Sequence, residues 1–112
     1  MEKIISVSGK ECTFKSSAAL PRLYRAKFGR DIFVDLSRLE KEMKRKDTLP
    51  PSSLEIFENI AYIMHKHGDP SQPSDIEKWL EQFDTFDIYM VLPELLKLWN
   101  IENITTSTSK KK

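Results

Sequence analysis

The sequence has few of the features that mark secreted or membrane-embedded proteins. Its single cysteine, Cys12, excludes an intramolecular disulfide and any CxxC metal or redox site. The amino terminus, Met1 to Ser6, lacks the long apolar segment of a signal peptide, and no run approaches the ~20 apolar residues that cross a bilayer. We therefore expect an intracellular protein that is neither exported by that route nor embedded in a membrane.

Sequence patterns typical of enzymes are also missing, since the chain contains no GxGxxG, GxxxxGK(S/T), HExxH or GxSxG motif. His65 and His67 are two residues apart on a predicted helix, so they project about 200° apart and cannot share a metal ion. We expect both to be exposed. Glu77 and Glu81 share a helix face without a companion histidine. We therefore predict no enzymatic activity and no catalytic, cofactor-binding or metal-binding residues.

The net charge of +1 conceals two halves of opposite sign. Residues 1–51 carry twelve Lys and Arg against seven Asp and Glu, a balance of +5, whereas residues 52–102 carry three against ten, a balance of −7. The two halves either complement each other within the fold or simply form solvated faces. Alternatively they support head-to-tail self-association, in which the basic half of one copy meets the acidic half of the next.

The chain begins with a predicted β-hairpin. Residues 3–7 and 11–15 flank the polar turn Ser8-Gly9-Lys10, a pattern typical of two short strands joined by a tight turn. Cys12, on the second strand, is expected to be a small core residue.

Two amphipathic helices follow, folded back on each other at Gly29. Ser17 is the predicted N-cap of the first helix, and Gly29 supplies the left-handed residue that ends it. Asp31 can cap the second helix, which is predicted to end at about Lys46. Apolar residues at helical spacing define the buried stripes: Leu20, Leu23, Tyr24 and Phe28, then Ile32, Leu36, Leu39 and Met43.

The third and fourth helices each begin with a predicted capping box, a hydroxyl followed three residues later by a carboxylate. The first box is Ser52 to Glu55, and its helix is predicted to stop at Gly68. The second box is Ser74 to Glu77, and it opens a short helix.

A fifth helix is predicted from about Thr85 to about Trp99, with a bend at Pro93. Its apolar surface is so wide that most of its sides should be buried. It is therefore either the central helix of the domain or a helix that meets another protein. The residues predicted to contact a partner are Phe86, Tyr89, Met90, Leu96 and Trp99.

These elements predict a mainly α fold, with about five helices in one compact domain and a short N-terminal β-hairpin. The domain is predicted to cover residues 1–102. Residues 103–112 have almost no apolar content and are predicted to form a disordered C-terminal tail.

A cluster of cations supports an alternative function, that of a nucleic-acid-binding adaptor or regulator. The cluster consists of Lys41, Lys44, Arg45 and Lys46, with Arg22, Arg25 and Lys27 available from the first helix. A domain that binds the phosphate backbone usually has a pI above about 9, whereas this chain has a pI of about 7.8 and an acidic half. Nucleic acid is therefore the less favoured partner.

Two blocks of the chain carry a resemblance to a known family. Residues 7–15, Val-Ser-Gly-Lys-Glu-Cys-Thr-Phe-Lys, match the hairpin pattern V-x-G-K-E-Y-x-F-K, and residues 20–31 match L-x-x-Y-R-x-x-F-G-R-D. Shorter matches follow at residues 61–64 (A-Y-x-M) and 79–83 (W-L-x-x-F), before a leucine-rich segment that ends at Trp99. Over residues 4–99 the sequence resembles the tail assembly chaperones of long-tailed bacteriophages and of prophages in Gram-positive bacteria. It departs from the family pattern at Cys12, Pro21 and Pro93.

The resemblance implies a function without catalysis. Such a chaperone binds the tape measure protein and recruits tail tube subunits before the tail tube polymerises. It acts in the cytoplasm of the bacterial host and is absent from the mature virion. Family members often occur also as a longer form made by translational frameshifting. Lys110 to Lys112 are compatible either with a slippery run of lysine codons or with a solubilising basic tail.

Overall fold

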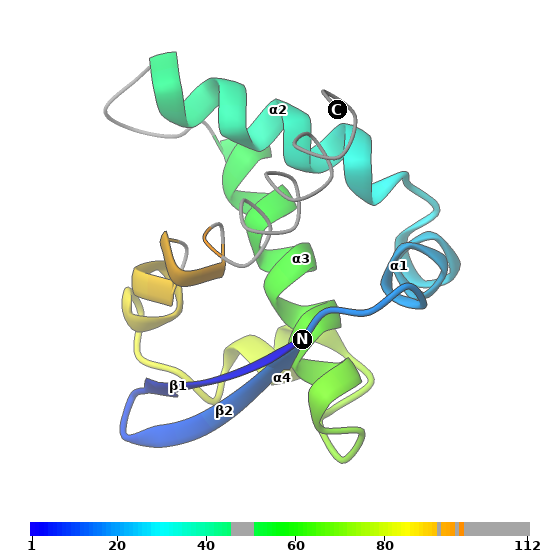
Figure 1. Cartoon of the computed structure of the whole chain (residues 1–112). Helices are drawn as coiled ribbons and strands as arrows, with labels where there is room; N and C mark the ends of the chain where they lie inside the picture. Colours follow the sequence, from blue (N-terminus) through cyan, green and yellow to red (C-terminus); the bar gives the residue numbers. More distant parts are fainter. Residues whose placement is uncertain (46–50, 92, 96, 98–112) are drawn as a thin grey trace.

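The computed structural model describes residues 1–45, 51–91, 93–95 and 97 of the chain (Figure 1). These residues form five helices and one antiparallel hairpin, so the predicted mainly α fold with an amino-terminal hairpin is confirmed. The elements are β1 (Glu2–Val7), β2 (Lys10–Lys15), α1 (Leu20–Phe28), α2 (Ile32–Arg45), α3 (Pro51–Gly68), α4 (Ile76–Leu80) and the 3-10 helix η1 (Asp87–Val91). The predicted tail, residues 103–112, lies outside the described residues. No helix in the described segments has the length and apolar character needed to span a membrane.

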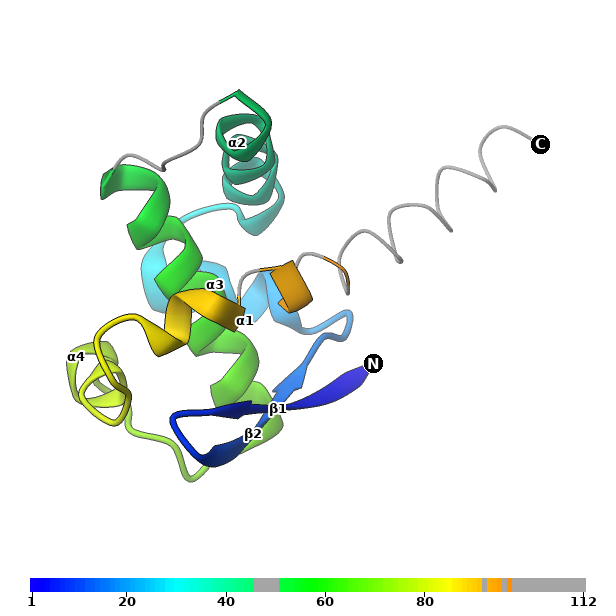
Figure 2. The same cartoon turned by 90° about the vertical axis from the view of Figure 1, so that its left-hand side faces the viewer.

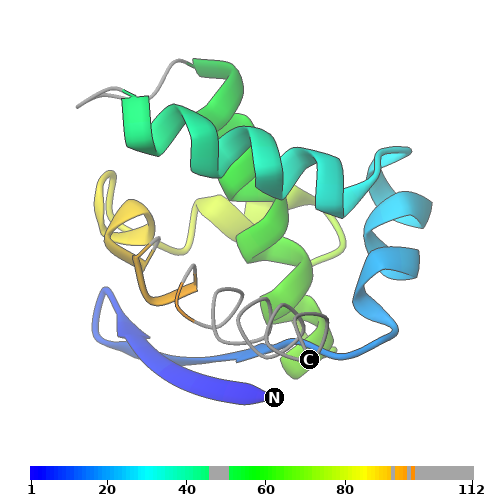
Figure 3. The same cartoon turned by 45° about the horizontal axis from the view of Figure 1, so that its top comes forward.

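α3 is the central helix of the fold. Figures 1 and 3 show α2 crossing one end of α3 and the hairpin crossing the other, with α1 and η1 on opposite sides of it. Figure 2, turned by 90°, shows α4 beside the hairpin end of α3. Six consecutive residues of α3, 60–65, are buried. A helix buries consecutive residues only when other elements cover all of its sides.

The hairpin forms as predicted because its turn residues adopt positive φ. Ser8 and Gly9 have φ of 52° and 79°, the left-handed values that both central residues of a type I′ turn require. The register pairs Val7 with Lys10 across this turn. Cys12 is buried in the core, as predicted.

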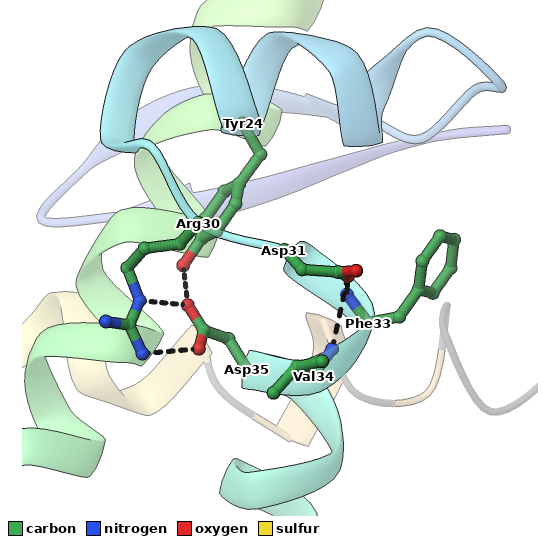
Figure 4. Close-up of polar contacts among 6 residues, drawn as sticks. All are labelled: Tyr24, Arg30, Asp31, Phe33, Val34 and Asp35. Carbon is green, nitrogen blue, oxygen red and sulfur yellow. Dashed lines mark hydrogen bonds and ion pairs between the residues drawn. The ribbon is translucent and has the colours of Figure 1, made fainter.

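The end of α1 and the cap of α2 form as predicted, but the two helices do not fold back on each other. Figures 1 and 3 show α1 beside α3, while α2 leads away from it across α3. Gly29 has φ of 68° and donates its N–H to the carbonyl of Arg25 at 2.7 Å, which ends α1. Asp31 Oδ1 accepts the backbone N–H groups of Phe33 at 2.8 Å and of Val34 at 3.3 Å (Figure 4). The aspartate therefore caps α2.

The predicted N-cap of α1 is wrong by two residues. α1 begins at Leu20, after Ala19, and no side chain caps it. Ser17 Oγ instead accepts the N–H of Ala19 at 3.2 Å and lies 2.7 Å from His67 Nε2. The hydroxyl therefore ties the connection between β2 and α1 to the end of α3. Pro21 lies in the first turn of α1, where its missing N–H costs no helical hydrogen bond.

The two predicted capping boxes are wrong as well. α3 begins at Pro51, so Ser52 lies inside its first turn. Proline suits this position because its fixed φ matches that of a helix. The N–H that it lacks would have no partner there, since the first N–H groups of a helix make no helical hydrogen bond. α4 is capped by Asp75 rather than Ser74, since Asp75 Oδ1 accepts the N–H of Glu77 at 3.0 Å.

The continuous fifth α-helix predicted from Thr85 to Trp99 is wrong over its first part, where the structure has the short 3-10 helix η1. Pro93 favours this difference, because it has no N–H to donate to the carbonyl of Tyr89 in an α-helix. Residues 92, 96 and 98–99 of the predicted helix lie outside the described residues. Among the described residues of this region, Ile88, Val91 and Leu95 are buried in the core and Tyr89 packs against it.

Candidate protein-interaction surface

The hydroxyl group of Ser8 links the hairpin turn to η1 and to the segment before it through two hydrogen bonds. Ser8 Oγ donates to Asp87 Oδ2 at 2.8 Å and accepts the N–H of Asp84 at 3.0 Å. Because Ser8 is held at positive φ in the hairpin turn, the turn geometry sets the position of this hydroxyl. An ion pair between Lys3 and Glu94 joins β1 to the residues after η1. The segment is therefore held against the hairpin at both of its ends.

Of the five residues predicted to contact a partner, Phe86, Tyr89 and Met90 are described, and all three lie on this segment. Phe86 is 75% exposed and Met90 is 76% exposed, the two highest values among the large apolar residues that the structure describes. Tyr89 is half-buried. Leu96 and Trp99 lie outside the described residues. We define the η1 surface as Phe86 and Met90, which lie at the surface of one anchored segment.

Tyr89 has a structural role that the sequence did not suggest. Its hydroxyl donates to Glu58 Oε2 at 2.6 Å, and its ring centroid lies 5.8 Å from that of Phe57. The hydrogen bond to Glu58, together with burial, raises the pKa of Tyr89 to about 12. The phenol therefore stays neutral and holds η1 against α3 at neutral pH.

The buried carboxylate of Asp35 organises the corner between α1 and α2. Its side chain is 1% exposed and receives two hydrogen bonds of 2.7 Å from Arg30, from Nε and Nη2 (Figure 4). The Tyr24 hydroxyl donates to the same carboxylate at 2.7 Å. A buried charge needs such partners, because an unpaired carboxylate in the core is costly.

The same contacts keep the cluster in one protonation state. The Arg30 hydrogen bonds hold the pKa of Asp35 below its ordinary value. Burial and the bond to Asp35 raise the pKa of Tyr24. The carboxylate is therefore ionised and the phenol neutral across neutral pH. The residues of the 20–31 motif thus build the corner: Tyr24 and Arg30 bind Asp35, Gly29 ends α1, and Asp31 caps α2.

The prediction that His65 and His67 are exposed is wrong. His65 is 3% exposed, and its Nδ1 accepts the indole N–H of Trp79 at 2.8 Å. Its ring centroid lies 5.3 Å from that of Phe14. β2 and α4 pack against the carboxyl end of α3 and cover it. Burial lowers the pKa of His65, so the ring is neutral and serves as a hydrogen-bond acceptor in the core. His67 is half-buried beside Ser17.

The described residues include no group of three or more His, Cys, Asp and Glu side chains that could hold a metal ion. Glu77 and Glu81 are both exposed at α4. Of the cations in the alternative nucleic-acid hypothesis, Lys41 and the α1 residues Arg22, Arg25 and Lys27 are exposed. The side chains of Lys44 and Arg45, and all of Lys46, lie outside the described part of the chain.

The opposite charges of the two halves meet in few ion pairs. Among the described residues, Lys3–Glu94 joins the basic half to the acidic half, whereas Arg30–Asp35 and Lys97–Glu94 each lie within one half. Most charged side chains of both halves that the structure describes are exposed to solvent.

A scan against protein-family models finds none that matches this chain, and searches of curated proteins and of solved structures find no match either. The functional hypothesis therefore depends on the motifs quoted above and on the geometry of the surface.

A second exposed apolar pair lies on the outer face of α2, and sequence reasoning did not single it out. Phe33 is 57% exposed and Val34 is 55% exposed. With Arg38 and Lys41 they line an open groove of about 470 Å³. The helical period contained the signal, because Ile32, Leu36 and Leu39 define the buried stripe and leave residues 33 and 34 facing outward.

Proposed function

We propose that this protein is a phage tail assembly chaperone that acts by binding other proteins. In this proposal it works in the cytoplasm of the bacterial host, binds the tape measure protein and recruits tail tube subunits, and it is left out of the mature virion. The resemblance over residues 4–99 supports the choice of family. The η1 surface supports a mode of action in which exposed apolar side chains bind a partner.

The exposure of Phe86 and Met90 on an anchored segment is the observation that carries the proposal. Apolar surface gains about 25 cal/mol for each Å² removed from water, so exposed large side chains are natural anchors for a partner. Methionine adapts its shape to different partners, and both phenylalanine and methionine are enriched in the buried cores of protein interfaces. The contacts of Ser8 and Tyr89 fix the backbone in advance, which lowers the ordering cost of binding.

The charges around the η1 surface indicate the chemistry of the partner segment. Glu81 and Asp84 are exposed in the residues that lead into η1. The Asp87 carboxylate is half-buried and bound by Ser8. A partner helix that presents apolar side chains flanked by Lys or Arg would satisfy both the apolar and the acidic parts of this surface.

Coexpression with a fragment of the tape measure protein tests the proposal. We expect the fragment to copurify with the parent chain and to be lost from Phe86→Ser and Met90→Ser variants. Phe33→Ser is the matched control, because it makes the same change at an exposed position on α2. Equal retention by Phe86→Ser and the parent would contradict the proposed contact surface.

Two further observations separate the proposal from the nucleic-acid alternative. The gene should lie between a tail tube gene and a very long tape measure gene, and metabolic neighbours would argue against the proposal. In mobility-shift titrations, tight binding of duplex DNA that weakens steeply with salt would favour the alternative.

A further inference from the structure

A groove distinct from the η1 surface lies between α1 and the carboxyl-terminal half of α3. It has a volume of about 310 Å³, which is at the small end of the range of about 300–1,000 Å³ for binding pockets. Its apolar walls are Leu23 and Ala26 on α1 and Tyr62 and Ile63 on α3. We call it the α1–α3 groove. Figures 1 and 3 show α1 and η1 on opposite sides of α3, so the groove and the η1 surface face different directions.

One apolar side chain of the groove, that of Leu23, is partly exposed to solvent. Leu23 is 38% exposed, whereas Tyr62 and Ile63 below it are 2% and 6% exposed. The apolar stripe of the first helix predicts burial of Leu23 together with Leu20 and Tyr24, yet only the latter two are buried. Leu23 is therefore partly exposed at one side of the groove, and Tyr62 and Ile63 form its buried base. This geometry suits the insertion of one apolar side chain.

Two ammonium groups stand at the edge of this groove. Lys27 Nζ donates to the carbonyl of Ser74 and lies 5.7 Å from the centroid of the Tyr62 ring. Lys66 Nζ donates to the carbonyl of Pro70 at 2.8 Å and to that of Gln72. An ammonium group has three donors, so Lys27 keeps two for a ligand and Lys66 keeps one.

The charge of these ammonium groups is not cancelled within the groove. The carbonyl partners carry no formal charge, and the described residues that line the groove include no carboxylate. A nearby acid is Asp75. Burial raises the pKa of Tyr62, and the negative charge of Asp75 raises it further. Asp75 is exposed and occupied as the cap of α4. The edge of the groove thus offers positive charge beside an apolar floor.

We propose that the α1–α3 groove is a docking site for a helix of a partner protein that presents one bulky apolar side chain flanked by carboxylates. The apolar side chain fills the space between Leu23 and Ile63, and the carboxylates accept hydrogen bonds from Lys27 and Lys66. This partner differs in charge from the one suited to the η1 surface. The inference does not rest on the proposed function, because it follows from the groove alone.

A titration of the full-length, nitrogen-15-labelled protein with two synthetic helical peptides tests this site. The peptides share one central Phe and differ only in their flanking residues, which are Glu in one and Lys in the other. We expect the Glu peptide to shift the amide resonances of residues 23–27 and 62–66 saturably, with an affinity that falls as salt rises. Equal binding of both peptides, or shifts confined to other regions, would overturn the proposal.

Two variants on α1 isolate the role of the groove. Lys27→Glu should weaken binding of the Glu peptide by about tenfold or more. Arg25→Glu is the matched control, because it makes the same charge change in the same last turn of α1 but does not line the groove. We expect it to change the affinity by less than about threefold. Equal losses in both variants would show a general charge effect and would overturn the proposal.

A third variant keeps the test decisive if Lys27→Glu perturbs the fold. Leu23→Ser changes a partly exposed side chain and should remove peptide binding while the amide spectrum outside the groove stays that of the parent. Undiminished binding in Leu23→Ser would overturn the proposal. Shifts of the groove resonances that grow with protein concentration alone would assign the groove to a second copy of this chain, which also contradicts it.

Discussion

We expect Gly68→Ala to destabilise this protein, although replacing glycine by alanine in an exposed helix normally stabilises a protein. Gly68 ends α3 where the helix packs against β2. A Cβ atom at this position would lie 2.4 Å from the carbonyl oxygen of Thr13 and 3.0 Å from its carbonyl carbon. Both are backbone atoms of a paired strand, so no side-chain rotation relieves the overlap.

The expected magnitude follows from two opposing effects. Overpacking of this kind costs about 1–3 kcal/mol, and the overlap here is severe because ordinary contact begins at 3.4 Å. Replacing glycine by alanine in a helix returns at most about 1 kcal/mol. We therefore expect Gly68→Ala to lower the free energy of unfolding by about 2 kcal/mol.

Urea unfolding followed by circular dichroism measures this loss, and Gly29→Ala is the informative control. At Gly29 an added Cβ meets nothing within 4 Å, but φ is +68°. The cost there is conformational, at about 1 kcal/mol. Hydrogen exchange distinguishes the two causes, because Gly68→Ala should speed exchange of the β2 amides more than Gly29→Ala does. A Gly68→Ala variant as stable as the parent would refute the packing described here.

Two further predictions concern the buried polar groups. We expect the losses of unfolding free energy in Arg30→Ala and Asp35→Ala to be non-additive, with a coupling of about 2 kcal/mol in the double variant. The reason is that either substitution alone removes the same bidentate contact on a buried carboxylate. Additive losses would contradict this contact. Stability should fall as the pH drops from about 7.5 to about 5.5, because burial holds the pKa of His65 below its ordinary 6.5, so the unfolded chain binds the proton more readily. His65→Gln, which cannot take up that proton, should show a shallower pH dependence in urea unfolding, and identical slopes would argue against the buried contact with Trp79.

Local signals in the sequence predicted the elements that depend on a few neighbouring residues. The hairpin turn follows from Ser8-Gly9, and the helix corner follows from Gly29 and Asp31, because positive φ and side-chain capping are decided within a few residues. The starts of α1, α3 and α4 were wrong because several residues compete to cap a helix. A proline at the first helical position or a neighbouring aspartate prevailed over the predicted serine.

The tertiary roles of polar residues were the part that the sequence did not predict. Asp35 falls on the buried face of α2 with Ile32, Leu36 and Leu39, and a carboxylate on that face was a usable sign of a buried partner. His65 gave no comparable sign, because its burial depends on β2 and α4, which approach from distant parts of the chain. The contact of Ser8 with Asp84 and Asp87 likewise joins residues far apart in sequence.

Calorimetric titration with a tape measure fragment tests whether this chain acts by covering apolar surface of another protein. Burial of apolar surface gives a negative heat-capacity change on binding. We predict such a change for the parent chain, and a markedly smaller one together with weaker binding for the Phe86→Ser, Met90→Ser double variant. Binding with no heat-capacity change, or an identical change in the double variant, would contradict the proposed mode of action.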